Sequence, residues 1–446
     1  MLDLLIRNGT IVDGQGAMAG SIGVSGQRIA ARYAQGETLP PARETIDADG
    51  LMVLPGVVDP HVHFYGEGIG EYSRLAVRGG VTTFMGMIRG APERPLADVV
   101  EDHRKAGLAE AVTDFAFHVV LYDREETIGQ IASLAAQGCR SFKMFMAYKR
   151  RDMMVRDEFL FAAMHEIRRV GGIALVHAEH GEMIDYMEQR SIADGRVAAE
   201  YYEPSRPAEA EAAAIEIVAL AAQATGCPAY IVHLSSTEGL AAIERARRRG
   251  VPIWAETCPQ YLTMDDGDLR LHGAAAKIAP PLRSPADRRS LGTALMTGAV
   301  NTVGSDHASF SVEAKSGDIS IFAVPFGMSG APTLWPAMFT WALDSDIPLS
   351  IVVRAMTEAP ARLFGLAHRK GTLLPGADAD VILIDPKLRQ TVDMKAISPN
   401  VCPNPQAAVP LAGWPLVTLS RGEVVWRGGE VVGSPGRAQL IAQVRN

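Results

Sequence analysis

"MVLPGVVDPHVHF", from Met52 to Phe64, joins a mostly apolar run to two histidines. A run rich in valine and leucine is typical of a buried strand in a sheet whose two faces are covered. His61 and His63 lie two residues apart, so on an extended strand both imidazoles point to the same face. The stretch therefore predicts a buried strand that ends in two side chains able to bind a metal ion.

Seven further runs of the same kind follow, and helical patterns separate them. The amphipathic stretches 96–112 and 209–225 are long enough for crossover helices between parallel strands. Eight such repeats predict a TIM (β/α)8 barrel with insertions, whose site would lie at the carboxyl ends of the strands. The seven further strands are expected at 80–88, 113–121, 141–148, 172–179, 229–235, 252–262 and 301–308.

The two ends of the chain have a different character from the middle. Short β-rich runs broken by Gly and Asp occur before residue 50 and return in "DADVILIDP" and "LVTLSRGEVVWRGGEVVG". We expect residues 1–52 and 371–446 to fold together as one small β-sandwich domain. Residues 53–370 are then expected to form the barrel.

Composition and charge restrict the class of partner. The formal net charge is −8, and the sequence has no Lys/Arg-rich tract for nucleic acid or an anionic membrane. The N-terminal residues alternate apolar and polar side chains and resemble neither a signal peptide nor a membrane span. Four cysteines without metal-binding spacing are expected to be reduced thiols in a cytoplasmic protein. The expected partner is a small molecule.

Residues able to bind a metal recur where the apolar runs end. His177 ends "IALVH", His233 ends "YIVH", and Asp306 follows "NTVG". In a barrel these side chains would meet His61 and His63 at one mouth. Imidazole and carboxylate ligands suit zinc or another first-row divalent ion, and an open site of this kind holds a reactive water.

Lys143 lies inside "SFKMFMAYK", where an ammonium group would have to leave water. A lysine in such a run is usually paired, neutral or chemically altered, because an unpaired buried cation costs several kcal/mol. One interpretation is a lysine that reaches water from an edge strand. In the predicted barrel Lys143 would instead enter the mouth that contains the histidines.

The chain resembles the cyclic amidohydrolases, and most closely the hydantoinases and dihydropyrimidinases. The resemblance runs through "NGTIVDG", "LPGVVDPHVH", "FKMFMAYK", "HAEH", "HLSS", "ETCPQYLTMD", "PPLR", "GSDHA" and "GADADVILIDP", and so covers nearly the whole sequence. It implies an enzyme that opens a hydantoin, a dihydropyrimidine or a related cyclic imide. It also implies a homo-oligomer, either a tetramer or a dimer.

The resemblance further implies a site with two zinc ions. His61, His63 and Asp306 would bind the first ion, and His177 and His233 would bind the second. Lys143 would react with carbon dioxide to give a carbamate that bridges both ions. Two catalytic residues are implied: Asp306 would move the proton, and Tyr148 would stabilise the oxyanion and contact the substrate.

The residues expected to contact the substrate ring depart from the usual pattern of this family. Ala279 precedes "PPLR" where hydantoinases usually have serine, and "GMSGAPT", which contains Gly330, departs from Gly-x-x-Gly-x-Glu. Both Ala279 and Gly330 are expected to contact substrate through main-chain groups. Arg150 and Arg151 are interpreted as part of a solvated face.

Three alternative functions stay open at this point. An allantoinase would have a similar set of ligands. A dihydroorotase-like enzyme is less favoured, because Phe64 and Tyr65 follow His63 where dihydroorotases usually have an arginine. A non-catalytic scaffold related to the dihydropyrimidinases would have lost metal ligands, whereas all six ligand positions are present here.

Overall fold

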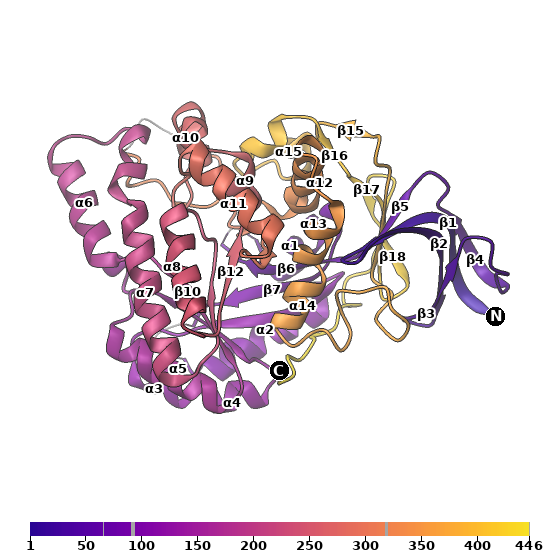
Figure 1. Ribbon diagram of the computed structural model, residues 1–446, viewed down its shortest axis with the longest axis horizontal. Helices are drawn as coiled ribbons and strands as arrows, with labels where there is room; N and C mark the ends of the chain where they lie inside the picture. Colours follow the sequence, from indigo (N-terminus) through magenta and orange to yellow (C-terminus); the bar gives the residue numbers. More distant parts are fainter. Residues whose placement is uncertain (66, 91–93, 317–319, 446) are drawn as a thin grey trace.

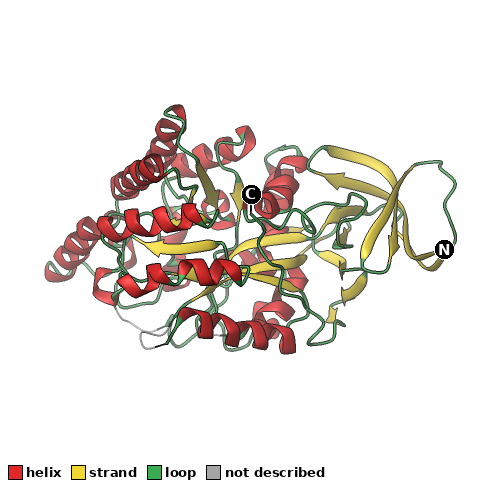
Figure 2. Cartoon of the chain, turned by 90° about the horizontal axis from the view of Figure 1, so that it is seen from below, coloured by secondary structure: helices red, strands yellow, loops and turns green. Residues whose placement is uncertain are grey.

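The computed structural model describes residues 1–65, 67–90, 94–316 and 320–445. It has two parts, a barrel of strands surrounded by helices and a sheet built from both ends of the chain (Figures 1 and 2). In Figure 1 the first strands (indigo) and the last strands (yellow) lie together on the right of the barrel.

Eight parallel strands form the barrel, in the order in which they occur along the chain. They are β6 (Val57–Val62), β7 (Val81–Ile88), β8 (Asp114–Val120), β9 (Ser141–Phe145), β10 (Ile173–His177), β11 (Ala229–Ile231), β12 (Ile253–Thr257) and β13 (Thr302–Val303). Each falls within one of the eight runs expected from the sequence, so the predicted TIM barrel is confirmed. All eight strands are almost entirely buried, because helices cover them outside and side chains fill them inside.

The barrel closes between its first and last strands. Val62 forms a bridge with His307, just beyond β13, and the His63 amide donates to the His307 carbonyl at 2.8 Å. The imidazole of His307 in turn accepts from the Ala331 amide at 3.0 Å and contacts Glu67. This closure brings the carboxyl end of β13 beside the carboxyl end of β6.

Helices fill the connections between strands and form the outer layer of the barrel (Figure 1). The two helices expected from amphipathic patterns are both present, as α2 and α7. The helices are α1 (Ile69–Ala76), α2 (Leu96–Glu110), α3 (Glu125–Gly129), α4 (Ile131–Ala136), α5 (Asp157–Arg169), α6 (Gly181–Ala193), α7 (Ala208–Thr225), α8 (Thr237–Arg248), α9 (Pro259–Thr263), α10 (Asp266–His272), α11 (Pro285–Thr297), α12 (Leu334–Asp344), α13 (Leu349–Met356), α14 (Glu358–Leu363) and α15 (Met394–Ile397).

Strands from both chain ends form one nine-stranded sheet. Its strands are β1 (Leu2–Asp13), β2 (Gly16–Ser25), β3 (Arg28–Ala34), β4 (Ala42–Asp47), β5 (Met52–Pro55), β14 (Val381–Ile384), β17 (Pro415–Ser420), β18 (Glu423–Arg427) and β19 (Glu430–Val431). β5 pairs with β1 on one side and with β14 on the other, which joins the two ends of the chain. A separate two-stranded sheet pairs β15 (Arg389–Gln390) with β16 (Leu411–Ala412).

The run from Met52 to Phe64 is divided between the two parts. β5 pairs in the nine-stranded sheet, and β6 begins the barrel two residues later. Gly56 lies between them, and a Cβ there would lie 2.1 Å from the Thr82 hydroxyl oxygen. Only glycine therefore fits at this crossing. We propose that the domains divide close to Gly56 and again in the segment after α14.

Two further expectations concern cysteines and membranes. The thiols of Cys139, Cys227, Cys258 and Cys402 are all free, as the sequence predicted. None of the helices in the described ranges combines the length and apolar character that crossing a membrane requires.

A buried charge network connects the barrel to the nine-stranded sheet. The Lys370 ammonium contacts Asp114, at the start of β8, at 2.6 Å, and contacts Asp378 and Asp380, just before β14, at 2.9 and 2.8 Å. Arg421 also contacts Asp114, at 3.0 Å. Burial alone would lower the pKa of Lys370, but the three carboxylates raise it, so the lysine stays charged. The network holds the two parts in one arrangement.

We expect Lys370→Met to destabilise the protein by about 3–5 kcal/mol, because it leaves buried carboxylates without their counter-charge. Urea unfolding followed by circular dichroism measures the change. Arg7→Gln, which removes the exposed ion pair with Asp47, is the control and should change little. An unchanged midpoint for Lys370→Met would mean that desolvation of the lysine cancels the benefit of its ion pairs.

Candidate active site

The metal-binding side chains expected from the sequence meet at the carboxyl ends of the barrel strands. His61 belongs to β6 and His63 follows it, while His177 is the last residue of β10. His233 and Asp306 lie in the loops directly after β11 and β13. A cavity of about 270 Å³ opens over these side chains and is lined by His63, His177, His233 and Asp306 among others. This is the end of a TIM barrel at which active sites occur.

His61, His63 and Asp306 form a group in which each residue offers a ligand atom to one point. The two Nε2 atoms are 3.2 Å apart, and Asp306 Oδ1 lies 3.2 Å from His61 Nε2 and 3.4 Å from His63 Nε2. Ligand atoms around a tetrahedral zinc ion are separated by about 3.3 Å, since zinc bonds to nitrogen and oxygen are about 2.0–2.1 Å long. The residues present therefore fit a small divalent ion.

Glu256, at the end of β12, orients two of the histidines. Its carboxyl group lies 2.6 Å from His61 Nδ1 and accepts from the Tyr230 hydroxyl at 2.8 Å and from the His233 amide at 3.1 Å. Burial raises the pKa of Glu256 to about 8, and a cation bound nearby would favour the charged carboxylate that accepts the Nδ1 proton. A proton held at Nδ1 leaves His61 Nε2 with a free lone pair, which is the form that binds a metal. Burial lowers the pKa of His61 well below its usual value, so this imidazole is neutral.

His177 and His233 form a second group beside the first. His177 Nδ1 lies 2.9 Å from His233 Nε2, and His177 Nε2 lies 2.6 Å from Glu179 Oε2. Arg206 contacts Glu179 in turn, with 3.1 Å between Nε and Oε1. Burial alone would raise the pKa of Glu179, but Arg206 and His177 lower it to about 2. This charged carboxylate holds a proton on His177 Nε2 and leaves Nδ1 free to face a metal.

Lys143 is fully buried in the middle of β9, and its Nζ has no hydrogen-bond partner among the described residues. Its Nζ lies 4.9 Å from the centroid of the Phe145 ring. Burial lowers the pKa of Lys143 to about 7, although the Asp306 and Glu256 carboxylates favour the ammonium form. Lys143 therefore does not reach water from an edge strand, and a neutral amine is readily accessible in this environment.

Three residues of the site have backbone conformations that are unusual for side chains with a Cβ. Tyr148, His233 and Asp306 have φ angles of 69°, 41° and 47°. Left-handed conformations of this kind store strain and persist only where the surrounding structure enforces them. Here they turn three side chains sharply back over the ends of their strands and into the cavity.

Tyr148 lies between the second histidine group and the cavity. Its hydroxyl is 3.4 Å from His177 Nδ1, and its ring stacks on Phe326 with 4.9 Å between centroids. Burial raises the pKa of Tyr148 well above its usual value, so the hydroxyl keeps its proton and can donate it in a hydrogen bond.

The two residues expected to contact the ring through their main chain lie in different places. Ala279 lines the cavity. Gly330 does not, because it packs against the Ser305 carbonyl, 3.0 Å from where its Cβ would be, and Gly327 lines the cavity instead. A substrate contact at Gly330 stays a prediction that no described contact supports.

Arginines also line this cavity. Arg89 and Arg151 are among its lining residues, whereas Arg150 points away and pairs with Asp185 at 2.6 Å. Both adjacent arginines are exposed, in keeping with their interpretation as a solvated face, and Arg151 also borders the cavity.

Sequence reasoning did not assign several residues that hold the site together. Glu179 and Glu256 lie in the quoted motifs "HAEH" and "ETCPQYLTMD", so position within a motif was an available signal. Arg206 lies in an irregular segment before α7, and no pattern marked its contact with Glu179. Glu179 precedes α6 and Arg206 follows it, so their contact forms only when the chain on the two sides of α6 comes together.

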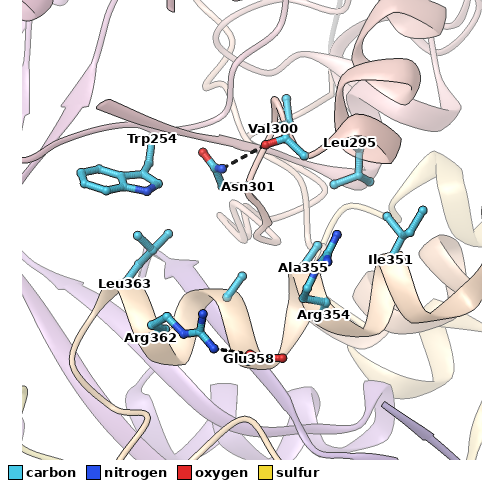
Figure 3. Close-up of a pocket in the computed structure, with 12 residues that line it drawn as sticks. Trp254, Leu295, Val300, Asn301, Ile351, Arg354, Ala355, Glu358, Arg362 and Leu363 are labelled. Carbon is cyan, nitrogen blue, oxygen red and sulfur yellow. Dashed lines mark hydrogen bonds and ion pairs between the residues drawn. The ribbon is translucent and has the colours of Figure 1, made fainter. Parts of the chain in front are cut away.

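A second hollow, of about 250 Å³, lies near the amino ends of β12 and β13 (Figure 3). Trp254 and Leu363 face each other across it, and Arg362 pairs with Glu358 on α14. The donor groups described above lie at the opposite ends of these strands, so this hollow is separate from the candidate active site.

Residues 52–425 match the Amidohydrolase family. The chain is 31% identical to a D-hydantoinase of Rhizobium radiobacter, with 98% of each chain covered. It is 32% identical to a D-phenylhydantoinase of Escherichia coli (strain SE11), with 98% of this chain and 97% of the relative covered.

Solved structures agree with these relatives. The fold matches a dihydropyrimidinase from Brevibacillus agri with a TM-score of 0.93, 29% identity and 99% of both chains covered. It matches an L-hydantoinase from Arthrobacter aurescens with a TM-score of 0.92, 30% identity, and 99% and 100% of the two chains covered.

We expect Glu256→Gln to weaken binding of a divalent metal by about ten- to a hundredfold, because an amide cannot ionise when a cation binds and so holds the Nδ1 proton of His61 less firmly than a carboxylate does. Competition with a chromophoric chelator measures this affinity. Glu211→Gln is a matched control, since Glu211 is a buried glutamate that binds Ser235 and Ser236 outside the donor groups. Equal metal affinity in Glu256→Gln and wild type would show that packing alone orients His61.

Proposed function

This chain belongs to the amidohydrolase family, and we propose that its activity is metal-dependent opening of a cyclic amide or imide, as in hydantoinases and dihydropyrimidinases. One observation carries the proposal. A lysine amine without a hydrogen-bond partner among the described residues, whose pKa burial lowers to about 7, lies beside four histidines and an aspartate at the active end of a TIM barrel. An amine in that position is suited to modification, because neither solvent nor another side chain competes for it.

The donor groups are suited to two divalent ions, which we infer to be zinc. His61, His63 and Asp306 would hold one ion, and His177 and His233 the other. The neutral Lys143 amine would attack the carbon of carbon dioxide and lose a proton, which converts a potential cation into an anionic carbamate with two oxygens. When bound, such a metal pair supplies a water of lowered pKa and Lewis acidity toward a carbonyl oxygen.

Asp306 and Tyr148 would then carry the reaction. Asp306 accepts the proton of the attacking water as the new bond from oxygen to the amide carbon forms. Tyr148 donates a hydrogen bond to the carbonyl oxygen as negative charge develops there. The amide C–N bond breaks, Asp306 returns the proton to the leaving nitrogen, and the ring opens to a carboxylic acid that keeps a carbamoyl or amide group.

Several features favour this proposal over its alternatives. A non-catalytic scaffold would not need neutral histidines, strained backbone and a buried amine around one cavity. An allantoinase or a dihydroorotase-like enzyme would share the metal centre and differ in the ring that it accepts. We further infer a cytoplasmic protein, in keeping with its four free thiols, that assembles as a dimer or tetramer.

A metal assay coupled to a panel of rings tests the function. The metal-loaded protein is given hydantoin, dihydrouracil, allantoin and dihydroorotate, and ring opening is followed directly. Opening of hydantoin or dihydrouracil supports the proposal. Opening of allantoin or dihydroorotate alone would assign the chain to that other activity, and no turnover with a full metal complement would favour a scaffold.

We expect Lys143→Ala to lose metal and turnover together, because both bridging oxygens disappear. Short carboxylic acids should restore part of the activity by occupying the vacated space. Lys143→Met is the matched control: its side chain fills that space, so it should be inactive without rescue. Metal content by mass spectrometry and ring opening are the measurements, and a fully loaded, active Lys143→Ala enzyme would refute the carbamate.

We expect Asp306→Asn to keep much of its metal but to lose about a hundred- to ten-thousandfold in turnover, because an amide oxygen still binds a cation but does not accept a proton. Metal content and kcat are measured on the same sample. Turnover within a few-fold of wild type would show that another group moves the proton.

A further inference from the structure

Arg89 and Arg151 bring two positive charges to a cavity that is otherwise mainly aromatic. In the described parts of the chain neither guanidinium forms an ion pair, and Asp306 is the single carboxylate among the residues that line the cavity. Most arginines elsewhere on this surface do have a carboxylate partner, as Arg150 and Arg156 do. Two unpaired guanidiniums in one cavity require a separate explanation.

Arg89 follows β7 and packs on an aromatic ring that extends from the metal site. Its Cζ lies 5.5 Å from the centroid of the Tyr65 ring. The Tyr65 ring stacks on His63, with 5.2 Å between centroids and an interplanar angle of 11°. Arg89 Nε also donates to the Tyr122 hydroxyl at 3.4 Å. The Tyr65 ring therefore lies between the Arg89 guanidinium and His63, an expected metal ligand.

Arg151 has the corresponding arrangement beside the catalytic tyrosine. It ends the short 3-10 helix Lys149–Arg151, and its Cζ lies 4.6 Å from the centroid of the Phe326 ring. Phe326 stacks on Tyr148 with 4.9 Å between centroids and an interplanar angle of 10°. Arg151 is therefore also one aromatic ring away from a residue that acts on the reacting carbonyl.

Stacking occupies the flat faces of the guanidiniums. Arg89 already donates from Nε to the Tyr122 hydroxyl and from Nη2 to Met153 Sδ at 3.6 Å, which leaves the N–H groups of its Nη1 for a ligand. Arg151 has no side-chain hydrogen bond among the described residues, so its whole N–H edge can face a ligand. Those N–H groups match the two oxygens of a carboxylate, which arginine binds through paired hydrogen bonds. Both arginines are exposed at the cavity mouth, so a pair with a carboxylate there would be partly screened by water. The combination is typical of a site for an anionic group attached to an apolar molecule.

We propose that Arg89 and Arg151 bind a carboxylate at the end of a short side chain on the cyclic amide, so that the substrate class is a ring bearing an acidic substituent. This inference rests on the proposed function, because it takes the ring to lie at the metal centre. One aromatic ring separates each guanidinium from His63 or Tyr148, so the carboxylate would need a spacer long enough to pass that ring. A carboxylate attached directly to the substrate ring, as in dihydroorotate, would lack this spacer.

The test compares two hydantoins that differ only in charge. One bears a carboxyethyl group on its ring carbon, and the other bears the carbamoylethyl group of the same shape. For the wild-type metal-loaded enzyme we expect kcat/KM for the acid to exceed that for the amide by roughly ten- to a hundredfold, as for hydrogen bonds to a charged partner. Added salt should reduce this preference, because it screens partly exposed charges.

Substitutions of the two arginines test whether they cause the preference for the acid over the amide. Arg89→Gln and Arg151→Gln should each reduce the ratio of acid to amide, and the double variant should bring it close to one. Hydrolysis of unsubstituted hydantoin should change little in all of them. Arg150→Gln is the matched control, because it removes the same charge from the adjacent residue, whose partner is Asp185, and it should keep the wild-type ratio.

Failure of this inference can be told from failure of the proposed function. Turnover of neutral hydantoins without preference for the acid, or a preference that survives in the double variant, would overturn the anion site and leave the hydrolase assignment intact. If no ring is opened, the hydrolase assignment fails, and calorimetric titration with both compounds then decides the anion site. Tighter binding of the acid that is lost in the double variant would support it, and equal binding would overturn it.

Discussion

The hydrogen bond from the His63 amide to the His307 carbonyl closes the ring of eight strands, and the rest of the site depends on that closure. Parallel strands in a closed barrel all end at one rim, so side chains separated by more than two hundred residues must face one another there. His61 and Asp306 come from the first and last strands, and their ligand atoms are 3.2 Å apart only because those strands are neighbours. An open sheet with the same strand order would leave the two residues at opposite edges.

Burial at this rim favours the uncharged form of its titratable side chains. Burial lowers the pKa of His61, His63, His177 and His233, so four imidazoles remain neutral and able to bind a cation. It also lowers the pKa of Lys143 to about 7, which makes the neutral amine accessible, and raises the pKa of Tyr148, which keeps its hydroxyl protonated. Charge is kept at the supporting carboxylate Glu179, which Arg206 neutralises. The centre is thus prepared for positively charged ions, and its own cations are placed elsewhere.

Polarity also changes with distance from the metal centre. Tyr65 and Phe326 cover His63 and Tyr148, and Arg89 and Arg151 cover the outer faces of those two aromatic rings. A substrate ring would meet metal ligands at its reacting end, aromatic surface along its body and guanidinium groups at its outer end. This layered order is the geometry from which the proposed preference for an acidic substituent follows.

Local sequence patterns were sufficient to predict the eight barrel strands, the crossover helices α2 and α7, and the positions of His61, His63, His177, His233 and Asp306 at strand ends. These features follow from period and residue type, which act over a few neighbouring residues. Four features could not be predicted in this way. They are the division of 52–64 at Gly56, the orientation of His177 by Glu179 and Arg206, the position of Gly330 outside the cavity, and the different contacts of Arg150 and Arg151. Each depends on contacts between residues far apart in the chain, and such contacts exist only after the barrel has closed, when packing decides which side chain faces the cavity and which faces water.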